Sequence, residues 1–75
     1  MFEINPATRK PTYAQIVDQV KLMLASGRLK ANAKLPSIRE TAEELGIDPN
    51  TVAKAYKQLE QEGVVKTRRG GGVYV

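Results

Sequence analysis

Residues 35–63 read LPSIRETAEELGIDPNTVAKAYKQLEQEG, and this stretch decides the fold. It begins with a helix start signal, because Ser37 is followed three residues later by Glu40. In such a capping box each of the two side chains accepts a hydrogen bond from the other residue's backbone N–H. Gly46 suits the left-handed position that ends a helix, since a glycine has no Cβ to clash there. The sequence therefore predicts a helix of about eight residues between Ser37 and Gly46.

A second helix start signal follows almost at once. Asp48 is a good N-cap, and Pro49 suits the first helical position, where its missing N–H costs nothing. Gly63 predicts the end of this helix, which thus covers about residues 49–62. Only residues 46–48 separate the two helices. A short helix, a tight turn with glycine and a longer helix are the pattern of a helix-turn-helix.

The chain before this motif contains a further helix. Residues 1–11 include Pro6 and Pro11, which disfavour helix, so we expect an extended N-terminal arm. From Thr12, which we expect to be the N-cap, a helix of about fourteen residues runs to Ser26-Gly27. Its apolar residues recur at helical spacing and are Tyr13, Ile16, Val17, Val20 and Leu24.

The chain after the motif has the composition of a hairpin. β-branched residues dominate 64–67 and 73–75, and the arginine- and glycine-rich segment 68–72 predicts a turn between two strands. Arg28-Leu29 could add a short edge strand. We therefore expect a mainly α domain with a small β-hairpin, a winged helix-turn-helix of three helices plus wing over residues 12–75. Its buried residues should include Ile16, Val20, Leu29, Leu35, Ile38, Leu45, Val52, Tyr56, Leu59 and Val65.

The longer helix of the motif has two chemically different faces. At about 100° per residue, one side collects the apolar residues Val52, Ala55, Tyr56 and Leu59. The opposite side has no carboxylate and collects Asn50, Lys54, Lys57 and Gln61. Asn and Gln can pair with adenine edges and Lys can donate to guanine or phosphate, as a helix in the major groove requires. An ordinary solvated face fits the same pattern, and the helix-turn-helix spacing favours the reading of DNA.

The shorter helix of the motif has fewer groups that could bind a polyanion. Its outer face carries Glu40, Glu43 and Glu44, which phosphate would repel, so only its first turn should approach DNA. Ser37 in that turn is foremost a cap. Arg39 either contacts DNA or pairs with a nearby glutamate.

The predicted hairpin turn is rich in cations. Lys66, Arg68 and Arg69 precede three glycines, which let the backbone approach a partner closely. The negative potential of a minor groove attracts guanidinium groups, so this hairpin could enter one. The alternative is a plain polar turn or a flexible tail, and the β-branched residues 73–75 argue against the tail because they need a strand partner.

The composition excludes several classes of function. The 75 residues contain no cysteine and no histidine, which removes disulfides, thiolate metal sites and the commonest general base. The carboxylates form no constellation for metal or acid–base chemistry. A net charge of +4 favours a polyanionic partner. We expect no enzyme, no cofactor and no metal, and a cytoplasmic protein without a membrane span or signal peptide.

Together, these residues resemble the DNA-binding domain of the GntR family from about Pro11 to Val75. The resemblance lies in Leu35-Pro36-Ser37-Ile38-Arg39-Glu40, Leu45-Gly46-Ile47, Asn50-Thr51-Val52, Ala55-Tyr56-Lys57-Gln58-Leu59-Glu60, Glu62-Gly63, Gly70, Gly72 and Val73-Tyr74-Val75. Within the family, residues 49–56 look most like the YtrA-like branch.

The resemblance implies which residues contact DNA. Arg39 matches a DNA-contacting arginine, Asn50 and Thr51 match contact positions early in the recognition helix, and Arg69 and Gly70 match the wing tip. Pro49 stands where many members have a base-reading arginine, so base reading should shift toward Asn50, Lys54 and Lys57. The expected DNA-binding set is Ser37, Arg39, Pro49, Asn50, Thr51, Lys54, Lys57, Arg68, Arg69, Gly70 and Gly71.

The resemblance also implies a sequence-specific DNA-binding transcription regulator, with repression as the expected mode. Helix 49–62 would lie in the major groove of double-stranded operator DNA and wing 66–73 at its minor groove. Family members dimerise and bind small-molecule effectors mainly through a C-terminal domain, which we expect this chain to lack. The intact protein would be a homodimer. The alternative function is a winged helix used for protein–protein contact.

Overall fold

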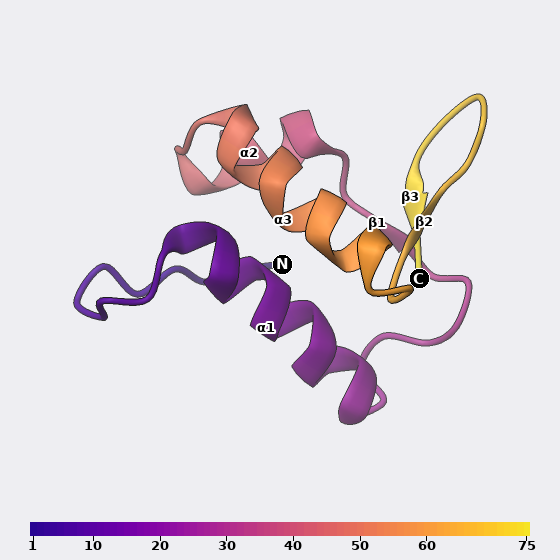
Figure 1. Ribbon diagram of the computed structural model, residues 1–75, viewed down its shortest axis with the longest axis horizontal. Helices are drawn as coiled ribbons and strands as arrows, with labels where there is room; N and C mark the ends of the chain where they lie inside the picture. The colour runs from indigo at the N-terminus through magenta and orange to yellow at the C-terminus, as the bar shows by residue number, and fades with distance from the viewer.

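Three α-helices and three short strands make up the computed structural model, which describes all residues 1–75 (Figure 1). The elements follow in the order α1 (Thr12–Ala25), β1 (Lys34–Leu35), α2 (Ile38–Leu45), α3 (Pro49–Gln61), β2 (Lys66–Thr67) and β3 (Val73–Tyr74). Helix α3 packs against both α1 and α2. The loop between β2 and β3 projects away from the helices as the wing (Figure 1). The predicted winged helix-turn-helix is thus confirmed.

The helix-turn-helix forms through the local signals in its sequence. The Ser37 hydroxyl accepts a hydrogen bond from the Glu40 N–H at 3.0 Å, and the Glu40 carboxylate accepts one from the Ser37 N–H at 3.1 Å. Gly46 ends α2 with a φ of 66°, in the left-handed region that favours glycine. The Asp48 carboxylate caps α3 by accepting from the Asn50 N–H at 2.8 Å.

Helix α1 has the predicted bounds but a different cap. Its N-cap is Pro11, and no side chain accepts a hydrogen bond from its first turn. The prediction that Thr12 is the cap was wrong, because Pro11 has φ −57° and an extended ψ of 148°, which makes Thr12 the first helical residue. The helix ends at Ser26 and Gly27 as predicted, with Gly27 at a φ of 78°.

The wing belongs to a three-stranded antiparallel sheet with the strand order β1-β3-β2. The predicted hairpin is confirmed, with Thr67 opposite Val73. The edge strand considered at Arg28-Leu29 was wrong, because the third strand is β1, which places Leu35 opposite Val73. The N–H groups of Arg28-Leu29 both donate to the Met23 carbonyl at the end of α1, which satisfies them outside the sheet.

The hydrophobic core lies between the three helices and the sheet. Of the predicted core residues, those confirmed as buried are Ile16, Val20, Leu29, Leu35, Val52, Tyr56, Leu59 and Val65. Ile38 and Leu45 are only partly buried at its edge. Helix α2 instead buries Thr41 and Ala42.

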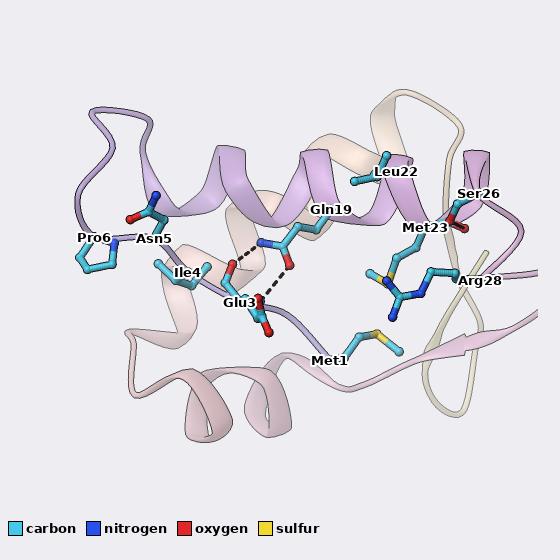
Figure 2. Close-up of a pocket in the computed structure, with 10 residues that line it drawn as sticks. All are labelled: Met1, Glu3, Ile4, Asn5, Pro6, Gln19, Leu22, Met23, Ser26 and Arg28. Atoms are coloured by element: carbon cyan, nitrogen blue, oxygen red, sulfur yellow. Dashed lines mark hydrogen bonds between the residues drawn. The ribbon is translucent and has the colours of Figure 1, made fainter.

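Residues 1–11 pack against α1 and reach into the core. Phe2 is 5% exposed and belongs to the hydrophobic cluster. The Glu3 N–H donates to the Gln19 side chain at 2.9 Å, as Figure 2 shows beside a hollow lined by this segment and α1. The Asn5 N–H donates to the Gln15 side chain at 2.8 Å. The segment predicted as an extended arm is therefore docked on the helix.

Candidate nucleic-acid interface

The outward face of α3 is polar and exposed along its whole length. Its exposed residues are Asn50, Lys54, Lys57 and Gln61. Its buried residues are Val52, Ala55, Tyr56 and Leu59. The assignment of faces that the sequence predicted is therefore confirmed. The side-chain amide of Asn50 makes no hydrogen bond within the chain, although its backbone N–H is used by the cap.

The first turns of α1 and α3 meet at a shallow hollow of about 430 Å³, lined by Pro11, Thr12, Tyr13, Asn50, Thr51 and Lys54. Three of these residues belong to the predicted DNA-binding set. The Lys54 ammonium lies 4.0 Å from the centre of the Tyr13 ring, a cation–π contact between the two helices. The sequence assigned Tyr13 to the core alone, and the structure makes it half-buried, with its ring also facing a lysine of the candidate interface.

The first turn of α2 carries Ser37 and Arg39. The Ser37 hydroxyl and N–H are both used by the capping box, so this serine acts as a cap first. The hydrogen bond that the Ser37 N–H donates to the Glu40 carboxylate lowers the pKa of that carboxyl below its ordinary value of 4.5. The Arg39 side chain is 88% exposed and lies 3.6 Å from the Glu43 carboxylate. Such an exposed pair is weak, which leaves the guanidinium available to a stronger anion.

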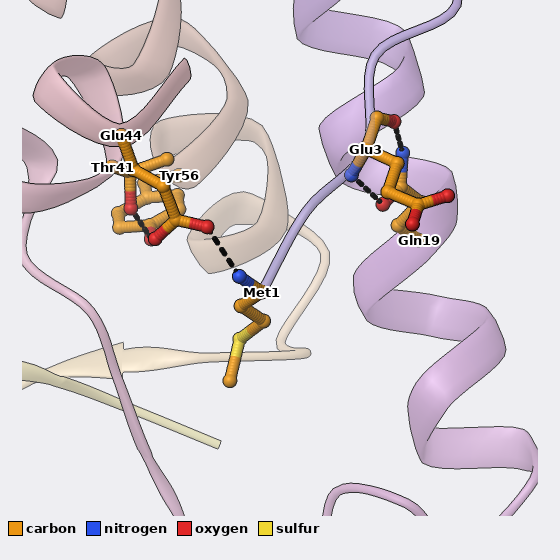
Figure 3. A network of polar contacts seen from close by, with 6 residues as sticks. All are labelled: Met1, Glu3, Gln19, Thr41, Glu44 and Tyr56. Carbon is orange, nitrogen blue, oxygen red and sulfur yellow. Dashed lines mark hydrogen bonds and ion pairs between the residues drawn. The ribbon is translucent and has the colours of Figure 1, made fainter.

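The other carboxylates of α2 and α3 also have partners within the chain. Glu44 forms an ion pair with the N-terminal ammonium of Met1 (Figure 3). The Glu60 carboxylate accepts a hydrogen bond from the Thr67 N–H at 3.2 Å, which joins the end of α3 to the first strand of the wing. Neither contact was predictable from the sequence, because each joins residues from different elements.

A hydrogen-bond network supports α3 on the side opposite its outward face. The Tyr56 hydroxyl donates to the Pro36 carbonyl at 2.8 Å. The Thr41 hydroxyl lies 3.1 Å from the Tyr56 hydroxyl oxygen (Figure 3). Burial raises the pKa of Tyr56 above its ordinary value of 10.0. Because the network joins α3 to the start of α2, it fixes the angle at which the outward face of α3 is presented.

The wing has a tight tip and two arginines in different settings. The Arg68 N–H donates to the Gly72 carbonyl at 3.0 Å, and the Gly71 N–H donates to the Arg68 carbonyl at 3.2 Å. The Arg68 guanidinium stacks 4.2 Å from the centre of the Tyr74 ring. Arg69 is exposed and forms neither an ion pair nor a cation–π contact. Gly70 beside it has a φ of 88°, which a residue with a side chain adopts only with strain.

The cations of α3 and the wing lack ion-pair partners, whereas the carboxylates of α2 and α3 have partners. The exposed cations of α3 and the wing have no carboxylate within ion-pair distance, and they are Lys54, Lys57, Lys66, Arg68 and Arg69. Each carboxylate of α2 and α3, in contrast, has a partner inside the chain. An unpaired cationic surface of this kind attracts a polyanion.

No three His, Cys, Asp or Glu side chains gather into a group that could hold a metal ion. None of the helices is both long and apolar enough to cross a lipid bilayer.

Comparison with known proteins places the chain among transcription regulators. Residues 12–75 match the family described as "Bacterial regulatory proteins, gntR family". The chain is 47% identical over its whole length to the HTH-type transcriptional repressor YtrA of Bacillus subtilis, of which it covers 58%. It is also 42% identical over 88% of its length to the uncharacterized regulator YhcF of the same organism, of which it covers 54%. The chain thus spans somewhat more than half the length of these relatives.

Solved structures show the same fold. A transcriptional antiterminator from Listeria monocytogenes superposes with a TM-score of 0.94 at 43% identity, over 100% of this chain and 56% of that one. The GntR-family transcription factor YtrA from Sulfolobus acidocaldarius gives a TM-score of 0.90 at 40% identity, over 99% of this chain and 78% of that one. AraR(DBD) in complex with operator ORX1 gives 0.82 at 25% identity, over 97% of this chain and 90% of that one. The family match, the relatives and the shared fold show that this chain belongs to the GntR family of bacterial regulatory proteins, which are DNA-binding transcription regulators and not enzymes.

Proposed function

We propose that the chain recognises a specific operator with α3 in the major groove and the wing at the minor groove. One observation carries this proposal: the outward face of α3 and the wing hold cations without ion-pair partners, while each carboxylate of α2 and α3 has a partner within the chain. The residues that we propose to contact DNA are Ser37, Arg39, Pro49, Asn50, Thr51, Lys54, Lys57, Arg68, Arg69, Gly70 and Gly71.

We propose that Asn50 is the main residue that reads a base. Its side-chain amide has no partner in the chain and lies exposed in the first turn of α3, where side chains of a recognition helix meet base edges. An amide can donate and accept at once, which matches the N6 and N7 atoms of adenine. We propose that Arg39, Lys54 and Lys57 contact phosphate or guanine around it.

The wider biological role follows from the relatives. Because YtrA is a repressor, we propose that this chain represses transcription by occupying its operator. We propose further that it acts in the cytoplasm of a bacterium, as part of a homodimer in a longer regulator whose additional domain would bind any effector.

The test uses a duplex that the chain itself selects from a random DNA pool. We expect Asn50→Ala to weaken binding to the selected duplex by about 1–3 kcal/mol and to change binding to a scrambled duplex little. Gln61→Ala is the matched control, because Gln61 is an exposed amide on the same face at the other end of α3. Equal weakening on both duplexes would mean that Asn50 does not read a base.

The second candidate is a winged helix that contacts another protein. The exposed Leu22 and Met1 beside the hollow of Figure 2 favour it, since apolar side chains at a surface suit a protein partner. Failure to enrich any duplex from the pool would favour this candidate over DNA recognition.

A further inference from the structure

The contact between Tyr13 and Lys54 joins a helix of the scaffold to the outward face of α3. Tyr13 lies at the start of α1, and Lys54 lies one turn beyond Asn50. The lysine ammonium sits 4.0 Å from the ring centre, over the face that carries the negative part of the aromatic quadrupole. The two side chains form part of the hollow that Asn50 and Thr51 also line.

Tyr13 is more exposed than the apolar residues that form the buried centre of its helix. Ile16, Val17 and Val20 are at most 2% exposed, whereas Tyr13 is only half-buried. Its hydroxyl makes no hydrogen bond within the chain, so packing and the lysine are the only contacts that orient its ring. Packing alone therefore does not account for all that this side chain does.

The contact with the Tyr13 ring is the interaction that orients the Lys54 ammonium, because no ion pair does so. Lys54 is exposed, and no carboxylate lies within ion-pair distance. A lysine on a flexible stem loses rotamer freedom when it binds a partner, and this loss weakens binding. A ring that already holds the ammonium in place reduces that loss.

We propose that Tyr13 is a positioning residue for DNA recognition, because its ring holds the Lys54 ammonium beside Asn50 and Thr51, ready for an acceptor oxygen of DNA. This inference rests on the proposed function of α3. It assigns a role at the interface to a residue of α1, outside the helix-turn-helix.

A double-mutant cycle tests this proposal on the selected duplex. Tyr13→Leu should weaken binding by about 2- to 5-fold, the size of an exposed cation–π contact. Tyr13→Phe keeps the ring and should stay within about 2-fold of the wild type. In a Lys54→Ala background Tyr13→Leu should have no further effect, because the lysine that the ring positions is gone. Thermal melting of each variant reports whether it is folded.

A second test uses the unbound wild-type protein, so its result does not depend on whether Tyr13→Leu folds. The ring current of Tyr13 should shift the NMR signals of the Lys54 ε-methylene protons upfield, and Tyr13→Phe should keep the shift. Unshifted signals would overturn the proposal, because the contact would then be unpopulated in solution.

Two binding results would also overturn it. Equal weakening by Tyr13→Leu with and without Lys54 would mean that the tyrosine acts by packing only. Tighter binding by Tyr13→Leu would mean that the ring competes with DNA for the lysine. If the wild type itself binds no duplex in a salt-dependent way, the proposed function fails, and that result is separate from the NMR result.

Discussion

Tyr56 shows how a single buried residue supports the exposed face of its helix. Its ring packs in the core, while its hydroxyl reaches the Pro36 carbonyl and the Thr41 hydroxyl at the start of α2. The Pro36 carbonyl is part-buried, and a carbonyl shielded from water loses free energy when its hydrogen-bond donor is removed. The relative orientation of α2 and α3 therefore depends on this one phenol.

We expect Tyr56→Phe to lower the free energy of unfolding by about 1–3 kcal/mol at neutral pH. The pKa of Tyr56 is raised above 10.0 in the folded state, mainly by burial, so its stabilising effect is complete below pH 10.0 and is lost as pH rises through the higher folded value. The difference between wild type and variant should therefore shrink in alkali. Urea unfolding followed by circular dichroism at about pH 7 and about pH 11 measures it.

Tyr74→Phe is the matched control, because the Tyr74 hydroxyl makes no hydrogen bond within the chain and its ring would remain against Arg68. It should change the free energy of unfolding little. A gap between wild type and Tyr56→Phe that stays constant across this pH range would contradict the role of the buried phenol.

Individual residues were predictable where the signal is local. The Ser37 capping box and the Gly46 C-cap need only a few neighbouring residues, and both are confirmed. The N-cap of α1 was not predictable, because Pro11 and Thr12 are both acceptable at a helix start. Only the backbone angles decide which of the two is the cap. The contact of Tyr13 with Lys54 could not be predicted, since helical spacing places residues on a face but does not say which side chains of another helix they meet.

At the scale of the elements, the wing is held by three kinds of contact. Leu35 of β1 pairs with Val73 of β3, Glu60 of α3 binds the N–H of Thr67, and Arg68 stacks on Tyr74. These contacts fix the base of the wing and leave Arg69 at its tip. The two arginines therefore have different surroundings in the structure.

We expect Arg69→Ala to reduce the slope of log K against log salt by about one unit, the effect of one lost phosphate contact. Arg68→Ala should change the slope less, because its guanidinium is held against Tyr74 at the sheet. Lys30→Ala, which removes an exposed cation from the loop after α1, is the control for net charge alone. A salt titration of duplex binding measures all three. An unchanged slope for Arg69→Ala would show that the wing tip does not touch DNA.

Among the elements, the helices were predictable and β1 was not. Each helix has a repeating apolar pattern and start and stop residues, so its bounds follow from nearby residues. A strand of two residues has no period to detect, and β1 exists because Lys34–Leu35 pairs with Val73–Tyr74 far along the chain. The faces of α3 were predictable for the same reason as its bounds, since the alternation of Val52 and Leu59 with Lys54 and Lys57 follows the helical repeat.

For the whole molecule, the arrangement separates the side that we propose to face DNA from a supporting side. Residues 1–11 dock on α1 through Gln15 and Gln19 and bury Phe2, so this segment adds to the core. One aromatic residue among prolines and polar residues shows no periodicity, which is why the sequence indicated only an arm. The segment also places the N-terminal ammonium against Glu44 (Figure 3).

We propose that DNA binds across α3 and the wing, and NMR of the labelled chain during titration with its selected duplex tests this mode of binding. At 8.3 kDa the protein is small enough for its amide signals to be resolved. This mode of binding predicts that the largest shifts fall in the first turns of α2 and α3 and at the wing tip, around Arg39, Asn50 and Arg69, and that they weaken as salt is added. It would be contradicted if the shifts gathered instead at the hollow around Met1 and Leu22, or if the amides of α3 and the wing did not move.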